Sequence, residues 1–83
     1  MTAGAFLKKC REKAGFSQDM MAQLMNRSQS DISKLEKDRK GIDLFTFRDW
    51  TMLTNAVEAG IAFMYNVDAA SLFQTAMQVV GVS

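Results

Sequence analysis

The chain has 83 residues, enough for one small domain, and 48% of them are hydrophobic while 23% are charged. A single cysteine excludes an internal disulfide, and the absence of histidine leaves no zinc-type ligand cluster. Charged residues interrupt the apolar stretches and the first residues lack the order of a signal peptide, so we expect a cytoplasmic protein with no membrane span.

The net charge of +1 conceals an uneven distribution. Residues 1–40 contain nine Lys and Arg against five Asp and Glu, a net +4, whereas residues 41–83 contain one Arg against four acids, a net −3. A basic half suits a polyanionic partner such as nucleic acid, although a solvated lysine-rich face has the same composition. We treat residues 1–83 as one domain with a basic half (1–42) and an acidic half (43–83).

The first predicted helix covers residues 3–14 and is stopped by Gly15. Phe6, Leu7 and Cys10 recur on one side of it, and most of the charged residues lie on the other. Because Cys10 is on the apolar side, we interpret it as a small buried hydrophobic residue rather than a reactive thiol.

Two short helices are predicted between residues 17 and 37, with a non-helical break at residues 26–28. Ser17 can cap the first of them, and Asn26 tolerates the left-handed conformation that a tight turn between helices needs. Ser28 opens the second helix, and Asp31 three residues later resembles a capping box. Amides, hydroxyls and lysines occupy the outer face of this second helix: Gln29, Ser30, Ser33, Lys34 and Lys37. Such a face, beginning at a rigid turn, suits the DNA major groove.

Residues 15–36 read G-F-S-Q-x-x-x-A-x-x-M-N-x-S-x-S-x-I-S-x-L-E. This run resembles the helix-turn-helix of the phage repressor/Cro family of transcriptional regulators, with about eight positions agreeing in register. The resemblance extends roughly from Leu7 to Trp50. It implies an all-α, five-helix repressor-like domain whose second and third helices form the helix-turn-helix, and a two-fold dimer that binds specific duplex DNA.

The resemblance also implies roles for individual residues. Gln29 would contact adenine, braced by Gln18, and Arg11 would pair with Glu36. Gln can bond adenine bidentately, and Lys can reach guanine. We assign the base contacts to Gln29, Ser30, Ser33 and Lys34. Sequence-independent contacts to the DNA backbone are assigned to Gln18, Arg27, Ser28, Lys37, Arg39 and Lys40.

Three residues depart from the family pattern. Met20 and Leu24 are apolar where the family has exposed polar residues, and they are either tolerated surface side chains or a patch for a partner. Arg27 stands in the turn, where an apolar residue is usual, and can reach a phosphate.

Asp43 is predicted to cap a long helix over residues 44–59, whose apolar stripe includes Leu44, Trp50 and Val57. We expect Trp50 to fill the core. The apolar residues 61–67 fit a buried helix end, a connector or a short strand, and periodicity leaves these alternatives open. A last helix is predicted after Asp68. The apolar surplus of this half predicts a dimer interface formed by Ile61, Phe63, Leu72, Phe73 and Met77.

An enzyme is a poor alternative, because the sequence has no histidine, no phosphate-binding glycine loop and no metal-ligand cluster, and no cofactor is expected. The stronger alternative is a protein–protein interaction module, such as an antitoxin or anti-repressor that binds a partner through its apolar C-terminal half.

Overall fold

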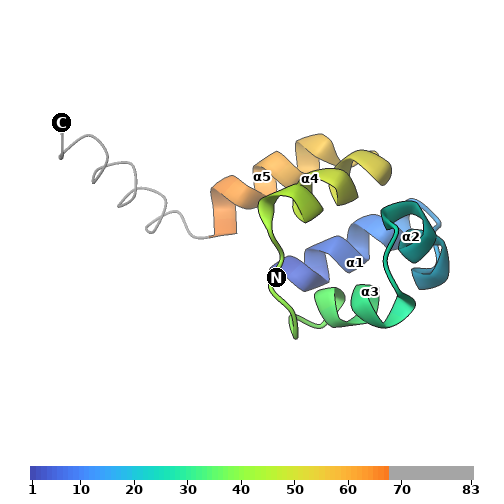
Figure 1. Cartoon of the computed structure of the whole chain (residues 1–83). Helices are drawn as coiled ribbons and strands as arrows, with labels where there is room; N and C mark the ends of the chain where they lie inside the picture. Colours follow the sequence, from blue (N-terminus) through green and yellow to red (C-terminus); the bar gives the residue numbers. More distant parts are fainter. Residues whose placement is uncertain (68–83) are drawn as a thin grey trace.

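The structure, a computed structural model, describes residues 1–67, which form five helices and no strand (Figure 1). In chain order these are α1 (Ala3–Lys13), α2 (Gln18–Met25), α3 (Gln29–Glu36), α4 (Leu44–Leu53) and α5 (Val57–Val67). The all-α, five-helix prediction is confirmed. The fifth helix, however, comes from the segment left open in the sequence, and the predicted helix after Asp68 lies outside the described residues.

Hydroxyl and carboxylate side chains begin four of the helices, and the caps of α2, α3 and α4 are those predicted from the sequence. The Ser17 Oγ accepts a hydrogen bond from the Met20 N–H at 3.0 Å, and the Ser28 Oγ accepts one from the Asp31 N–H at 3.0 Å. The Asp43 carboxylate accepts from the Thr46 N–H at 2.8 Å. At α1 the cap is Thr2. Each cap satisfies a backbone donor that has no partner within its helix.

Helices α1 to α4 all end in the same way. A residue with positive φ follows each of them: Gly15, Asn26, Asp38 and Asn55. The next N–H then reaches back five residues, as from Arg27 to the Ala22 carbonyl at 2.8 Å. This is the Schellman pattern of helix ends. At Asn55 it ends α4 at Leu53, so the predicted continuous helix over residues 44–59 is wrong.

The core lies where α1 to α4 meet. Leu7, Met21, Ile32, Leu35 and Trp50 are its largest fully buried side chains. Trp50 fills the core as predicted, and its indole N–H donates to the Leu7 carbonyl at 2.9 Å. This bond satisfies the one polar atom of the side chain. By contrast, Leu44 and Val57 were predicted on the buried stripe, but both are exposed.

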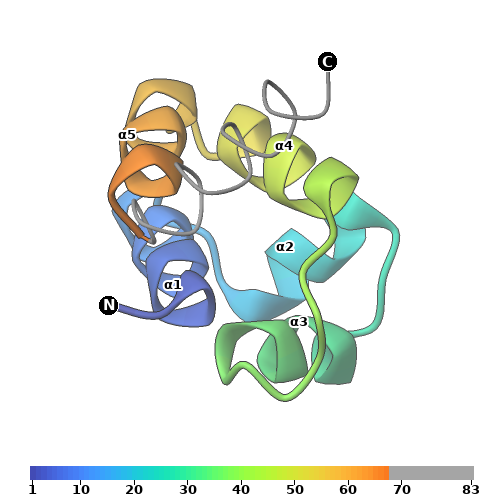
Figure 2. The same ribbon diagram turned by 90° about the vertical axis from the view of Figure 1, so that its left-hand side faces the viewer.

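Three phenylalanines attach α5 to this core. The Phe63 ring stacks on Phe6 at 4.4 Å between centroids, and Phe47 lies 5.9 Å from Phe6. Phe63, which was predicted at a dimer interface, is thus partly buried against α1 of the same chain. Gly60 permits the close approach of α5 to α4, because a Cβ there would lie 2.7 Å from the Thr51 methyl group. In Figures 1 and 2, α3 and α5 lie at opposite ends of the described molecule.

Candidate DNA-binding surface

The exposed face of α3 presents the predicted base-reading residues together. Gln29, Ser30 and Lys34 are exposed and Ser33 is half-buried. Ile32 and Leu35, on the opposite face, are buried in the core, which fixes the rotation of α3 about its axis. Helix α3 and the loop that follows it form one edge of the molecule (Figure 2). The outer face of α3 is thus free to approach a ligand.

A chain of hydrogen bonds runs from the core to Gln29. The Arg11 guanidinium contacts both Glu36 oxygens, with Nε 2.6 Å from Oε2 and Nη2 3.1 Å from Oε1. Gln18 Nε2 donates to the same Glu36 Oε1 at 3.0 Å. Gln29 Nε2 in turn donates to Gln18 Oε1 at 2.5 Å. The structure therefore brings together both pairs that the resemblance implied, Arg11 with Glu36 and Gln18 with Gln29.

The Arg11–Glu36 pair is buried, with side-chain exposures of 10% and 2%. The remaining terminal nitrogen of Arg11, Nη1, donates to the Phe16 carbonyl at 2.8 Å, so all three guanidinium nitrogens have partners. The hydrogen bond with Glu36 raises the pKa of Arg11, and burial opposes this shift more weakly. A bidentate, desolvated pair of this kind fixes the end of α3 against α1 and positions Gln18 beneath Gln29.

The basic loop after α3 supplies Lys37, Arg39 and Lys40, and all three side chains are exposed. Lys40 is already engaged, because its Nζ lies 2.6 Å from Asp31 Oδ1. Two residues earlier, Asp38 Oδ1 accepts a hydrogen bond at 2.8 Å from the Gly4 N–H in the first turn of α1. The loop therefore contacts both α1 and α3, and Lys40 is held beside α3.

The structure places Arg27 differently from the predicted phosphate contact. Its Nη1 lies 2.6 Å from Asp31 Oδ2, and its Nη2 donates to the Thr46 hydroxyl at 2.7 Å. That hydroxyl donates to Asp43 at 2.9 Å. Arg27 therefore joins α3 to the start of α4, in place of the apolar packing usual at this position. Sequence reasoning missed Thr46, because Thr is not the Glu or Gln that a capping box places three residues after the N-cap.

Asp31 accepts hydrogen bonds from both Lys40 and Arg27, and these hold the pKa of its carboxyl below the usual value. The capping-box prediction is correct for one of its two bonds, from the Asp31 N–H to Ser28. Instead of returning to the Ser28 backbone, the Asp31 side chain faces these two cations. Asp43 also has a lowered pKa, chiefly because the Thr46 N–H donates to it.

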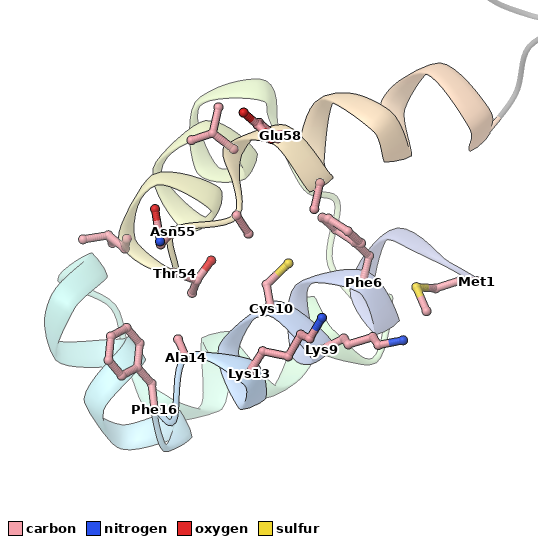
Figure 3. Close-up of a pocket in the computed structure, with 14 residues that line it drawn as sticks. Met1, Phe6, Lys9, Cys10, Lys13, Ala14, Phe16, Thr54, Asn55 and Glu58 are labelled. Atoms are coloured by element: carbon pink, nitrogen blue, oxygen red, sulfur yellow. The ribbon is translucent and has the colours of Figure 1, made fainter.

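An open cavity between α1 and the turn joining α4 to α5 lies apart from this surface (Figure 3). The Cys10 side chain lines it together with Thr54, and Lys9 and Lys13 lie beside it on α1. Burial raises the pKa of the Cys10 thiol, partly opposed by Lys13. A buried thiol with a raised pKa agrees with the structural role predicted for Cys10. No residue of α3 lines this cavity.

Two short helices joined by a tight left-handed turn, with the second helix presenting a polar outer face, define a helix-turn-helix protein. Residues 2–62 match the family described as helix-turn-helix domain, so the chain belongs to that family. No curated protein and no solved structure matches the chain. In the part that the structure describes, no helix has the length and apolar character to cross a membrane.

Proposed function

We propose that this protein is a cytoplasmic transcriptional regulator of the repressor/Cro type that binds specific duplex DNA by inserting α3 into the major groove. The carrying observation is the hydrogen-bond chain from Arg11 through Glu36 and Gln18 to Gln29. These bonds orient the Gln29 amide at the exposed start of α3, and a fixed orientation is what base recognition requires. We also propose that the protein is not an enzyme.

The proposed roles follow the position of each side chain. Gln29, Ser30, Ser33 and Lys34 read bases, whereas Ser28, Lys37 and Arg39 contact phosphates. Gln18 acts as the brace of Gln29, and Arg27 serves as a structural link. Selection of bound sequences from random duplexes tests this proposal directly. A two-fold dimer should select a palindrome whose half-sites lie about one DNA turn apart; recovery of no consensus would reject sequence-specific binding.

Gln29→Ala is expected to weaken binding to the selected site by about 1–3 kcal/mol and to relax one position of its consensus. The reason is that a bidentate amide contact with one base is lost. Lys37→Ala is the matched control on the same edge of the molecule. Loss of its phosphate contact should weaken all duplexes alike and flatten the salt dependence by about one unit. Titration of specific and random duplexes over a salt series distinguishes the two effects.

If Gln29→Ala lowers specific and non-specific affinity by the same factor, Gln29 does not read a base. Base recognition would then belong to other residues of α3.

We further propose that the protein dimerises through α5. This helix has one charged residue, Glu58, and exposes Ile61, Met64 and Tyr65 to solvent. A helix that is apolar on nearly all sides is normally covered. Because α5 lies away from α3, a contact there leaves the reading surface of each protomer free. Of the predicted interface, Leu72, Phe73 and Met77 lie outside the described residues.

Ile61→Glu is expected to give a folded monomer, because Ile61 is 51% exposed and a buried carboxylate would oppose the contact between protomers. Leu24→Glu is a matched control, since Leu24 is 46% exposed but lies on α2. Sedimentation of the wild type and both variants at about equal concentration measures the effect. A monomeric wild type, or dissociation only in the α2 variant, would contradict the α5 interface.

The same exposed apolar side chains favour a second candidate, a protein–protein interaction module of the antitoxin or anti-repressor kind. The two functions differ in their response to salt. DNA binding should lose about 0.9 decades of affinity per decade of salt for every phosphate neutralised, whereas an apolar contact with a protein partner should change little.

A further inference from the structure

The carboxylate of Asp31 binds two cations at the candidate DNA-binding surface, one through each oxygen. Asp31 Oδ2 lies 2.6 Å from Arg27 Nη1, and Asp31 Oδ1 lies 2.6 Å from Lys40 Nζ. Arg27 comes from the turn before α3 and Lys40 from the loop after it. Asp31 itself is in the first turn of α3, close to where the helix is expected to approach DNA.

The two cations are held with different strengths. Arg27 has a second partner in the Thr46 hydroxyl at 2.7 Å, and its side chain is only 26% exposed. Lys40 is 47% exposed, and among the described residues Asp31 is its one hydrogen-bond partner. An exposed ammonium on a flexible stem can exchange a partly exposed carboxylate for a phosphate without any change in the backbone. Lys40 is therefore the cation that can leave Asp31.

Asp31 is ionised at neutral pH, and its hydrogen bonds with Lys40 and Arg27 lower its pKa further. Its negative charge then acts in two ways. It binds the Lys40 ammonium, and it repels any phosphate that comes close to the start of α3. Thr46 and Asp43 face Arg27 from α4 and hold it in place, so Arg27 is not released when Lys40 moves.

We propose that Asp31 is an internal competitor of the DNA backbone, because it binds Lys40 and so largely withholds this cation from phosphates. Asp31 thereby sets the level of sequence-independent affinity and its dependence on salt. This inference rests on the proposed DNA-binding function and names a regulating residue within the same surface. Without Asp31, Lys40 would be free to neutralise one additional phosphate.

Asp31→Asn tests this on a random-sequence duplex that contains no selected site. Neutralising one more phosphate should raise affinity about five- to tenfold at ~0.1 M salt and steepen the salt slope by about 0.9. Asp31→Gln is a second variant, because Gln at this position supports a capping box and so preserves the start of α3. Asp49→Asn is the charge-matched control, since Asp49 pairs with exposed Arg48 on α4. It should change the slope by less than about 0.3.

Lys40→Ala in both backgrounds separates release of Lys40 from a general change in net charge. We expect this substitution to weaken binding less than about twofold in the wild type and about five- to tenfold in Asp31→Asn. Equal effects of Lys40→Ala in the two backgrounds, or equal effects of Asp31→Asn and Asp49→Asn, would overturn the proposal while leaving DNA binding intact. A wild type that binds no duplex even at low salt would reject the proposed function and this inference together. Random-duplex binding without a selected consensus would reject sequence-specific binding alone.

Discussion

Replacing Glu36 by alanine is expected to lower the free energy of unfolding by about 3–5 kcal/mol, because it leaves the buried Arg11 guanidinium without its carboxylate. Arg11 contacts Glu36 through two nitrogens, and the pair is nearly fully buried. Arg11→Ala should destabilise the protein similarly, since it leaves Glu36 buried with Gln18 as its one remaining hydrogen-bond partner among residues 1–67. Urea unfolding of both variants measures the loss.

Asp49→Ala provides the matched control for this pair. Asp49 forms an ion pair with Arg48 at 2.9 Å, but the Arg48 side chain is 58% exposed and the Asp49 side chain 47%. Exposed pairs contribute about 0.2–1 kcal/mol, so Asp49→Ala should change stability little. If Glu36→Ala and Asp49→Ala lower the free energy of unfolding equally, burial does not make the Arg11–Glu36 pair more important for stability than an exposed pair.

A double variant, Arg11→Met with Glu36→Met, separates the cost of an unpaired charge from the contribution of the pair. Apolar replacement of both partners of a buried ion pair is often neutral or stabilising, so most of the lost stability should return. DNA specificity should not return, because Gln18 loses the carboxylate that orients it under Gln29. A double variant that is fully stable and still selects the wild-type consensus would remove this pair from the base-reading mechanism.

Local rules predict the starts and most of the ends of the helices from the sequence. Ser17, Ser28 and Asp43 cap helices because a cap depends on a few neighbouring residues, and Asn26 ends α2 for the same reason. The break between α4 and α5 escaped prediction. Its three residues, 54–56, occupy nearly one helical period, so the apolar repeat continues through the turn without a change of phase.

Hydrophobic pattern alone does not determine which surface an apolar residue covers. Phe63 and Ile61 are both apolar members of α5, yet Phe63 stacks on Phe6 and Ile61 is exposed. A side chain directed to the core and one directed to a partner satisfy the same pattern, and only the packing of α5 on α1 and α4 separates them.

The site was predictable where the sequence resembles a known helix-turn-helix and unpredictable where long-range contacts are particular to this chain. The pairs of Arg11 with Glu36 and of Gln18 with Gln29 came from that resemblance. The contact of Lys40 with Asp31 depends on the path of the loop after α3, which propensities do not specify. The same is true of Asp38, which accepts a hydrogen bond from the Gly4 N–H 34 residues away.

Gly4→Ala is expected to lower the free energy of unfolding by about 1–3 kcal/mol or more, because α1 and α3 meet at Gly4 without room for a side chain. A Cβ there would lie 2.5 Å from the Leu35 carbonyl oxygen and 2.6 Å from that of Glu36. Both obstacles are backbone atoms at the end of α3, so they cannot turn aside as a flexible side chain would. The variant must instead separate the two helices, which weakens the Asp38 bond to the Gly4 N–H.

Gly41→Ala is the matched control, because a Cβ at Gly41 meets no atom within 4 Å and the backbone there does not require positive φ. The added methyl group restricts the unfolded chain, so this variant should be neutral or stabilised by about 0.4–1 kcal/mol. Urea unfolding of the two variants compares the same chemical change in crowded and open surroundings. If Gly4→Ala unfolds at the same urea concentration as Gly41→Ala, α1 and α3 are not in close contact at Gly4.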